Sequence, residues 1–329
     1  MIKDNKFYIN NLKTIVFLGH KEIHEDLIKI NKKLKIKSVV ITAKKKVISK
    51  NEIKYYRKQK LDKKFEKLVF NICNPKNTLF ISLSSRWLFT QNLIDNLFKK
   101  NLINFHNARL PIDAGGGGYS WRIMRNDRIC NFLAHVIDSN IDSGPIIAEK
   151  SLVFPSECKI PIDFENYENR NFLNYYEKII SKLKSGKNFE LFYQQKSLRR
   201  YNPRINTKVN GWINWDMNSY DLVNFINAFD DPYIGASTYI KNKQRVYIKK
   251  VQLHGGEVQN HPFMSGLIFR HERKWIAVSS PDQNSIIIER VLNKDGKNIL
   301  PELKEGDRFY TSPEKKFISR STRVKYKIK

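Results

Sequence analysis

Three polar residues near the middle of the chain have the types and spacing that acyl transfer requires. Asn104 and His106 are two positions apart in an apolar run that reads as a strand, and Asp142 follows in an Asp-Ser-Gly turn. Side chains at positions i and i+2 of a strand point to the same face, which places the amide beside the imidazole. An imidazole can move protons, a carboxylate can orient it and an amide can bind an oxyanion. An Asn-x-His pair alone is usually part of an ordinary core strand, so the surrounding sequence must decide.

The surrounding sequence forms a specific pattern. Its parts in chain order are Asn104-x-His106, Leu110-Pro111, glycines 115–118, Trp121, His135-x-x-Asp138 and Ile141-Asp142-Ser143-Gly144-Pro145-Ile146-Ile147. This order and spacing resembles the folate-dependent formyltransferases, which include glycinamide ribonucleotide, methionyl-tRNA and sugar N-formyltransferases. The resemblance implies that Asn104, His106 and Asp142 form a catalytic triad. It also implies that N10-formyltetrahydrofolate is the formyl donor and that no metal takes part.

The resemblance further implies which residues bind the two substrates. The pterin of the donor would lie against Ser84, Arg86, Trp87, Leu88, Ile137 and Ile141, and the acceptor against Gly115, Gly116, Gly117 and Trp121. Consecutive glycines let a backbone approach a ligand closely and expose its N–H groups. Ordinary alternatives remain: a flexible loop for the glycines, a packing role for Trp121 and a solvated charge for Arg86. His135 is expected to support the site by a hydrogen bond.

The acceptor side departs from the family pattern. Where the family usually has Ser-Leu-Leu-Pro after the histidine, this chain has Asn107-Ala108-Arg109-Leu110-Pro111, and the usual Arg-Gly after it is missing. These departures concern the acceptor rather than the chemistry. They favour the amine of a nucleotide-linked amino sugar, used in surface glycans such as lipopolysaccharide or O-antigen. Methionyl-tRNA is the alternative acceptor, and a non-catalytic RNA-binding protein that kept the fold is a third interpretation.

Length and composition limit the class of protein. A chain of 329 residues with 41% hydrophobic residues is globular and has room for two domains. Its three cysteines are far apart, which argues against a disulfide framework and fits a reducing compartment. No apolar run approaches the roughly 20 residues that cross a bilayer. We therefore expect a cytoplasmic enzyme without a membrane partner, and a homodimer by analogy with the sugar branch.

The chain is strongly basic, with a formal net charge of +28. Lys and Arg far outnumber acidic residues at 29–67 and at 314–329. A basic stretch can attract nucleic acid or another anionic ligand. Asn, Ile and Lys are abundant throughout the chain, however, which is also the pattern of an AT-rich coding sequence. The charge therefore leaves the substrate undecided.

The predicted catalytic residues need a rigid scaffold, and the first two hundred residues provide one. Strands and helices alternate there, which predicts a parallel-rich sheet with helices on both faces. The expected strands are 13–18, 38–42, 78–83, 103–105, 126–136 and 146–154, and the expected helices are 21–31, 62–71, 91–99 and 166–184. Ligands bind at the carboxyl ends of the strands in such sheets, where His106 lies. We expect an α/β fold with a Rossmann-like catalytic domain over residues 1–200.

The pattern changes after the polar, proline-interrupted stretch 187–210. A helix at 220–229, capped by Ser219, precedes short strands at 236–240, 244–253, 265–270, 275–279 and 285–291. Short, evenly spaced strands predict a small antiparallel sheet or barrel. Segments 212–216 and 226–236 also resemble the C-terminal domain of methionyl-tRNA and sugar formyltransferases. We expect a smaller β-rich, OB- or barrel-like domain over residues 201–329.

Overall fold

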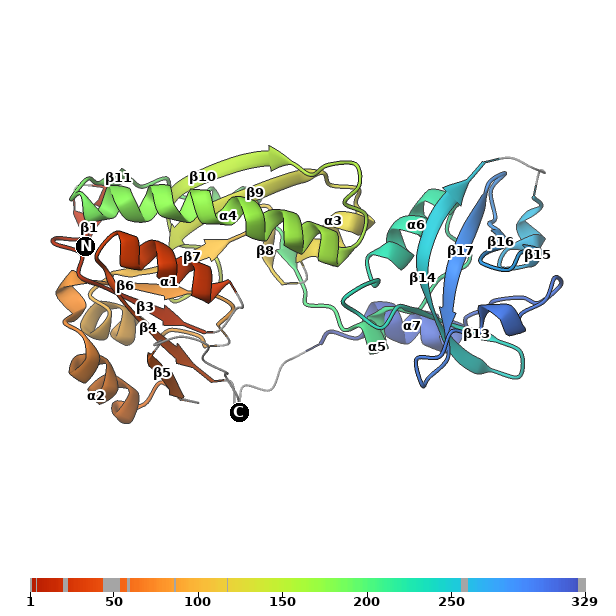
Figure 1. Ribbon diagram of the computed structural model, residues 1–329, viewed down its shortest axis with the longest axis horizontal. Helices are drawn as coiled ribbons and strands as arrows, with labels where there is room; N and C mark the ends of the chain where they lie inside the picture. Colours follow the sequence, from red (N-terminus) through yellow and green to blue (C-terminus); the bar gives the residue numbers. More distant parts are fainter. Residues whose placement is uncertain are drawn as a thin grey trace.

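The computed structural model of the protein describes residues 2–3, 5–19, 23–43, 54–57, 60–85, 87–116, 118–255 and 260–324. The chain forms two lobes, the larger coloured red to green and the smaller cyan to blue in Figure 1. The larger lobe is built on a seven-stranded sheet and the smaller lobe on a five-stranded sheet. This confirms the predicted fold class, an α/β lobe with a parallel-rich sheet followed by a β-rich lobe.

The large sheet has the strand order β10-β9-β7-β6-β3-β4-β5. Its strands are β3 (Thr14–Leu18), β4 (Lys37–Thr42), β5 (Lys54–Arg57), β6 (Thr78–Ser82), β7 (Leu102–His106), β9 (Ile129–Val136) and β10 (Ile146–Val153). Strands β3 to β7 run parallel, whereas β9 is antiparallel to β7 and to β10. The register of β7 and β9 places Asn104 directly opposite His135.

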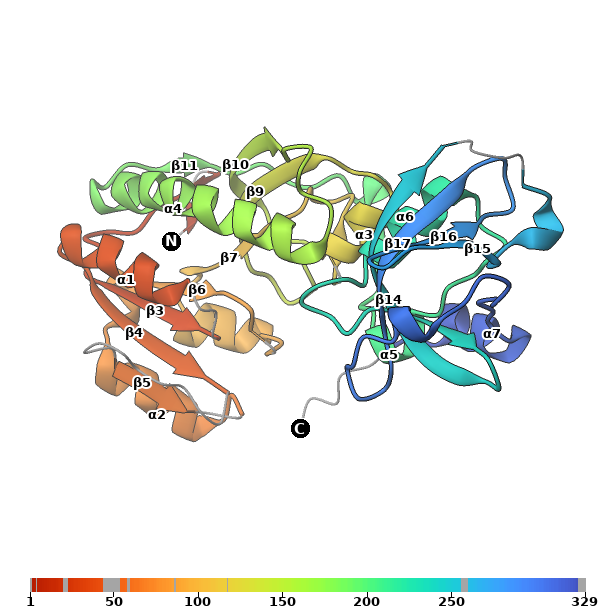
Figure 2. The same cartoon turned by 45° about the vertical axis from the view of Figure 1, so that its right-hand side comes forward.

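Helices cover both faces of the large sheet. Successive residues of a strand point to opposite faces, and each face packs into its own hydrophobic core. Ile15 and Phe17 of β3 face one hydrophobic cluster, and Val16 and Leu18 face another. The helices are α1 (His24–Lys33) and α4 (Pro161–Lys184) in the first cluster, and α2 (Lys63–Ile72) and a π-helix (Leu93–Leu97) in the second. Figures 1 and 2 show α1 and α4 on one side of the strands and α2 on the other.

The start of helix α4 and the form of the glycine run differ from the sequence prediction. Helix α4 begins at Pro161 rather than at 166, because proline suits a first helical turn and the Asp163 carboxylate accepts the N–H groups of Lys159 and Ile160. The glycine run is not a plain loop: Ala114–Gly115 forms the short strand β8, and Gly118–Met124 forms helix α3. Gly115 therefore lies in a strand, and Gly118 is the first residue of a helix.

The smaller lobe is a closed antiparallel sheet with the order β13-β14-β17-β16-β15. Its strands are β13 (Ala236–Ile240), β14 (Gln244–His254), β15 (Ile268–His271), β16 (Ile276–Ser279) and β17 (Ser285–Leu292). Tyr310 pairs with Tyr239 of β13, and Arg308 pairs with Leu267 beside β15. The segment around 308–310 thus joins the two edge strands, which gives the sheet the barrel-like form that the sequence predicts.

The remaining elements connect and cover the two lobes. They are β1 (Ile2–Lys3), β2 (Lys6–Phe7), β11 (Phe189–Glu190), β12 (Tyr201–Asn202), α5 (Thr207–Asn210), α6 (Ser219–Asn227) and α7 (Pro313–Ser321). Helices α3 and α6 pack across the lobes, where Ser120 Oγ donates to the Ala228 carbonyl at 2.7 Å. Within the described residues, no helix has both the length and the apolar character of a membrane span.

Candidate active site

A cavity of about 330 Å³ lies at the carboxyl ends of β6 and β7. Its walls come from residues after β6, the end of β7, the turn after β9, the glycine segment and the chain that leads to the smaller lobe. In a doubly wound sheet, ligands bind at this end of the strands. The topology therefore places a ligand site where the sequence predicts one.

Most of the predicted site residues line this cavity. They are Ser84, Trp87, Leu88, Asn104, His106, Gly115, Gly116, Ile137, Ile141 and Asp142. Trp121 lies instead on an adjoining cavity of about 170 Å³, which shares His106, Gly115 and Gly116 with the larger one. Arg86 and Gly117 lie outside the described residues. His106, Gly115 and Gly116 therefore line both the larger and the smaller cavity.

Asn104 and His135 meet across β7 and β9. Asn104 Nδ2 lies 3.2 Å from His135 Nε2, while His135 Nδ1 lies 2.8 Å from the Val136 carbonyl oxygen. A carbonyl only accepts, so Nδ1 of His135 carries the hydrogen and its Nε2 accepts from the amide. Asn104 therefore turns its NH₂ group toward His135 and retains a second N–H for a ligand. An N–H on the wall of the cavity is the donor that an oxyanion needs.

His135 is held in its neutral form. Its burial and the nearby His106 lower the pKa of His135 to about 4. The two ring centroids are 6.3 Å apart, a distance at which two imidazolium ions would repel each other.

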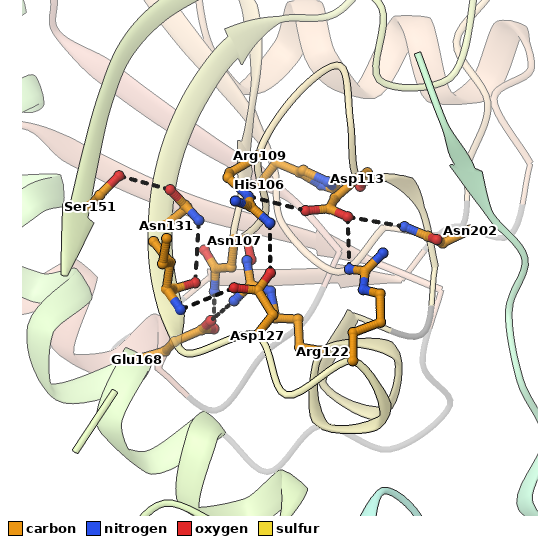
Figure 3. A network of polar contacts seen from close by, with 12 residues as sticks. His106, Asn107, Arg109, Asp113, Arg122, Asp127, Asn131, Ser151, Glu168 and Asn202 are labelled. Carbon is orange, nitrogen blue, oxygen red and sulfur yellow. Dashed lines mark hydrogen bonds and ion pairs between the residues drawn. The ribbon is translucent and has the colours of Figure 1, made fainter. Parts of the chain in front are cut away.

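His106 is oriented by a main-chain carbonyl. Its Nε2 lies 3.3 Å from the carbonyl oxygen of Asp113, so Nε2 carries the hydrogen and Nδ1 is the basic atom of the neutral ring. Figure 3 shows Asp113 beside His106, and the Asp113 carboxylate accepts from Asn202 at 3.4 Å and from Arg125 at 2.8 Å. The resemblance implied that Asp142 orients this imidazole, whereas in the structure the imidazole donates its hydrogen bond to the main-chain carbonyl of Asp113.

Asp142 lies in a turn with unusual backbone geometry. Its φ of 51° is in the left-handed region, which aspartate tolerates better than most residues. One carboxylate oxygen accepts the Gly115 N–H at 3.0 Å, and the other lies 3.9 Å from His135 Nε2. The carboxylate therefore joins the turn to the glycine segment and lies near His135. Together these groups supply a proton acceptor, an N–H donor and a negative charge around one space.

Known proteins are similar to this chain in sequence and in fold. Residues 206–303 match the family described as "Formyl transferase, C-terminal domain". Methionyl-tRNA formyltransferase of Mycoplasma capricolum is 25% identical over 289 residues, which cover 83% of this chain and 86% of that protein. These two matches support a relationship to the folate-dependent formyltransferase family. The chain is accordingly a formyl-transferring enzyme.

Two solved structures show the same fold. The sugar 3N-formyltransferase WlaRD, in the presence of dTDP and 5-N-formyl-THF, has a TM-score of 0.64 at 21% identity and covers 87% of this chain and 99% of its own. The N-formyltransferase from Helicobacter canadensis, in complex with folinic acid and dTDP-3-aminofucose, has a TM-score of 0.62 at 20% identity, with 84% and 99% covered. The two lobes of this chain are thus found together in both of these structures.

In this formyltransferase a buried ion pair supports the loop after His106. Arg122 of α3 lies 3.2 Å from Glu168 of α4, and both side chains are fully buried. The Glu168 carboxylate accepts from the Asn107 amide at 2.7 Å and from the Tyr119 hydroxyl at 2.5 Å, and Figure 3 shows the Asn107 contact. Burial raises the pKa of Tyr119 well above its usual value, so its hydroxyl remains a donor.

This network explains two departures from the family pattern. Asn107 is bonded to Glu168, and its carbonyl accepts from Arg122 at 2.6 Å. Arg109 is bonded to Asp127 at 2.7 Å. The sequence analysis attributed these departures to the acceptor side of the site, and in the structure the polar groups of both residues are engaged within the protein. They shape the loop that follows His106.

Among the residues that line the main cavity are two from the connecting chain that the sequence did not predict. Tyr201 and Arg204 belong to the chain that connects the lobes, and this chain passes close to the glycines. A Cβ on Gly115 would lie 2.3 Å from the Asn202 carbonyl oxygen, and one on Gly116 would lie 2.2 Å from Cγ of Arg204. The glycines therefore make room for the connecting chain. A polar segment without periodicity carries no sequence signal for such a role.

Proposed function

We propose that this formyltransferase moves a formyl group from N10-formyltetrahydrofolate to the amine of a nucleotide-linked amino sugar. The observation that carries the proposal is the placement of Asn104, His106 and Asp142 around one cavity of about 330 Å³. An imidazole, an N–H donor and a carboxylate are the groups that transfer of an acyl carbon to an amine requires. The product would serve surface-glycan synthesis, such as that of lipopolysaccharide or O-antigen.

The chemistry we assign to these groups is a two-step transfer. The acceptor amine attacks the formyl carbon, His106 takes a proton from the amine, and the N–H of Asn104 binds the oxygen as it becomes an oxyanion. The bond between the formyl carbon and N10 then breaks, N10 receives the proton from His106, and tetrahydrofolate leaves. Asp142 would stabilise the His106 imidazolium across the cavity and relay protons. Neutral His135 keeps the Asn104 donor in place.

The two substrates would enter from different sides of His106. We assign the donor pterin to the wall formed by Ser84, Trp87, Leu88, Ile137 and Ile141, together with Arg86. The acceptor would lie on the side of Gly115, Gly116 and Gly117, where the adjoining cavity of about 170 Å³ carries Trp121. His106 lines both cavities, so it can reach a formyl carbon in one and an amine in the other.

Two comparisons bear on the acceptor. The two sugar enzymes above share the fold over 99% of their own length, which supports a nucleotide-linked amino sugar. Sequence relatives that use methionyl-tRNA, at 25% identity, keep that acceptor as the second candidate. We further propose a cytoplasmic homodimer in which residues 1–200 are the catalytic domain and 201–329 the C-terminal domain.

Release of tetrahydrofolate from N10-formyltetrahydrofolate tests the proposal. The acceptors would be dTDP-, UDP- and GDP-linked amino sugars and methionyl-tRNA, with the matching hydroxyl sugars as controls. Turnover with one amino sugar and none with methionyl-tRNA would support the first candidate. Turnover with tRNA alone, falling steeply as salt rises, would establish the second. No turnover with any of these acceptors would overturn the proposal.

A further inference from the structure

The chain between the lobes, residues 191–206 and here called the linker, passes beside the catalytic turn before it enters the smaller lobe. We infer that Arg199 and Gln194 of the linker are positioning residues that hold the Asp142 turn in its active conformation. This inference rests on the proposed function, because it takes Asp142 as a catalytic group. The activity of the site would then depend on the path of the linker.

Both linker side chains bind carbonyl groups of the turn. The Arg199 guanidinium donates to the Ile141 carbonyl at 2.5 Å and to the Asp142 carbonyl at 3.2 Å. The Gln194 amide donates to the Asp142 carbonyl at 3.2 Å and to the Gly144 carbonyl at 2.7 Å. All four bonds go to main-chain oxygens between 141 and 144, so they fix the backbone of the turn.

The turn has a conformation that needs such support. The φ of Asp142 is 51°, and a non-glycine residue keeps a left-handed conformation only where its surroundings hold it. A Cβ on Gly144 would lie 1.9 Å from the Val136 carbonyl oxygen, so the turn packs tightly against the end of β9. Arg199 and Gln194 bind the carbonyl groups of the turn, which would otherwise need water as their hydrogen-bond donor.

The same part of the linker also holds the group that binds the Asp142 carboxylate. Ala114 N–H donates to the Arg200 carbonyl at 3.2 Å, and Gly116 N–H donates to the Asn202 carbonyl at 2.9 Å. Gly115 lies between them and donates its N–H to Asp142 at 3.0 Å. The linker therefore positions Asp142 in two ways. Its side chains hold the backbone of the Asp142 turn, and its main chain holds the segment of Gly115, whose N–H binds the Asp142 carboxylate.

The hydrogen bonds of Arg199 and Gln194 to the turn should affect the catalytic rate more than the stability of the fold. Arg199 and Gln194 are only half-buried, so their loss removes little packing. A displacement of a catalytic group by about 1 Å can lower a rate by about 10²-fold. We expect Arg199→Met and Gln194→Leu to lower kcat by up to that factor, with melting temperatures close to that of the wild type. Arg199→Lys should restore part of the rate, because an ammonium can donate to one of the two carbonyls.

A double-mutant cycle tests whether Arg199 acts through Asp142. Arg199→Met is combined with Asp142→Asn, and kcat is measured with the acceptor found above. The matched control is Arg200→Met, since the side chain of Arg200 is exposed and its contacts to residues near the site are made by its main chain. If Arg199 positions Asp142, Arg199→Met should have no further effect in the Asp142→Asn background. An equal loss in both backgrounds would overturn the inference.

Hydrogen exchange tests the same inference without an acceptor. Peptides that cover residues 110–116 and 136–146 should exchange faster in Arg199→Met and Gln194→Leu, and at the wild-type rate in Arg200→Met. Unchanged exchange in both linker variants would overturn the inference. Full activity of Asp142→Asn would instead overturn the catalytic role of Asp142, whatever the exchange shows. The two failures are therefore distinguishable.

Discussion

Asn104 and His135 lie directly opposite each other on β7 and β9, and their side chains meet at 3.2 Å. His135 gives its ring hydrogen to the Val136 carbonyl and stays neutral, so it can only accept from the amide. The orientation of the Asn104 amide is thus set by a residue on the neighbouring strand. The oxyanion donor that we propose depends on the protonation state of His135.

Removal of the Asn104 amide should slow the reaction. Loss of one oxyanion donor lowers turnover by about 10²–10³-fold, so Asn104→Ala should reduce kcat by that factor. Steady-state kinetics with the identified acceptor measure the effect. Asn96→Ala, at an exposed position that lines neither of the two cavities, is the control and should keep the wild-type rate. Wild-type kcat in Asn104→Ala would remove the amide from the mechanism.

The low pKa of His135 predicts how stability depends on pH. Its pKa falls from 6.5 to about 4 on folding, so the unfolded chain takes up a proton first as the pH drops. The stability that neutral His135 contributes is therefore complete above about pH 6.5 and is lost between pH 6.5 and 4. Between pH 7 and pH 5, the free energy of unfolding measured in urea should decrease less for His135→Asn than for the wild type. In the exposed control His261→Asn, this free energy should decrease as much as in the wild type. An equal decrease in all three proteins would contradict the low pKa assigned to His135.

The buried Arg122–Glu168 pair should be important for stability. Arg122→Met leaves the Glu168 carboxylate buried without its cation, and breaking such a pair costs about 3–5 kcal/mol. Urea unfolding at pH 7 measures this cost. Lys297→Met, which breaks the exposed pair with Glu302, is the control and should cost only about 0–1 kcal/mol. Similar values for the two variants would mean that the buried pair is not required for stability.

Two glycines that lie close together should respond differently to alanine. A Cβ on Gly116 would displace the Arg204 side chain from the cavity wall, whereas a Cβ on Gly118 meets no atom within 4 Å. Gly116→Ala should therefore raise the KM of the acceptor more than the Kd of 5-formyltetrahydrofolate. Gly118→Ala should leave both constants close to their wild-type values. An equal loss of donor and acceptor binding in Gly116→Ala would show that the glycine segment serves the donor or the fold.

Much of the fold could be predicted because the core strands are short apolar runs. Residues 14–18 and 78–82 are fully buried in the sheet, and their composition alone indicates strands. Strand β5 was missed because residues 54–57 are basic and aromatic and lie in a stretch without an apolar pattern. Helix α3 was missed because the glycines before it suggest a loop.

The site could be predicted where it depends on local spacing. Asn104 and His106 share a strand face, so their position on one cavity follows from the sequence. The roles of Asp113 and Arg199 depend on the path of the chain through space, because each binds residues that lie in a different segment. Trp121 illustrates the same limit, since it lines the adjoining cavity and donates to the Pro203 carbonyl at 2.8 Å.

The most direct test of the account compares tetrahydrofolate release by the wild type and by His106→Ala, with N10-formyltetrahydrofolate and the accepted amino sugar nucleotide. His106 is assigned both proton transfers, and a general acid–base group contributes about 10²–10⁴-fold to a rate. We predict that His106→Ala releases tetrahydrofolate more slowly by that factor, at an unchanged melting temperature. Release at the wild-type rate by His106→Ala would contradict the catalytic role on which the account depends.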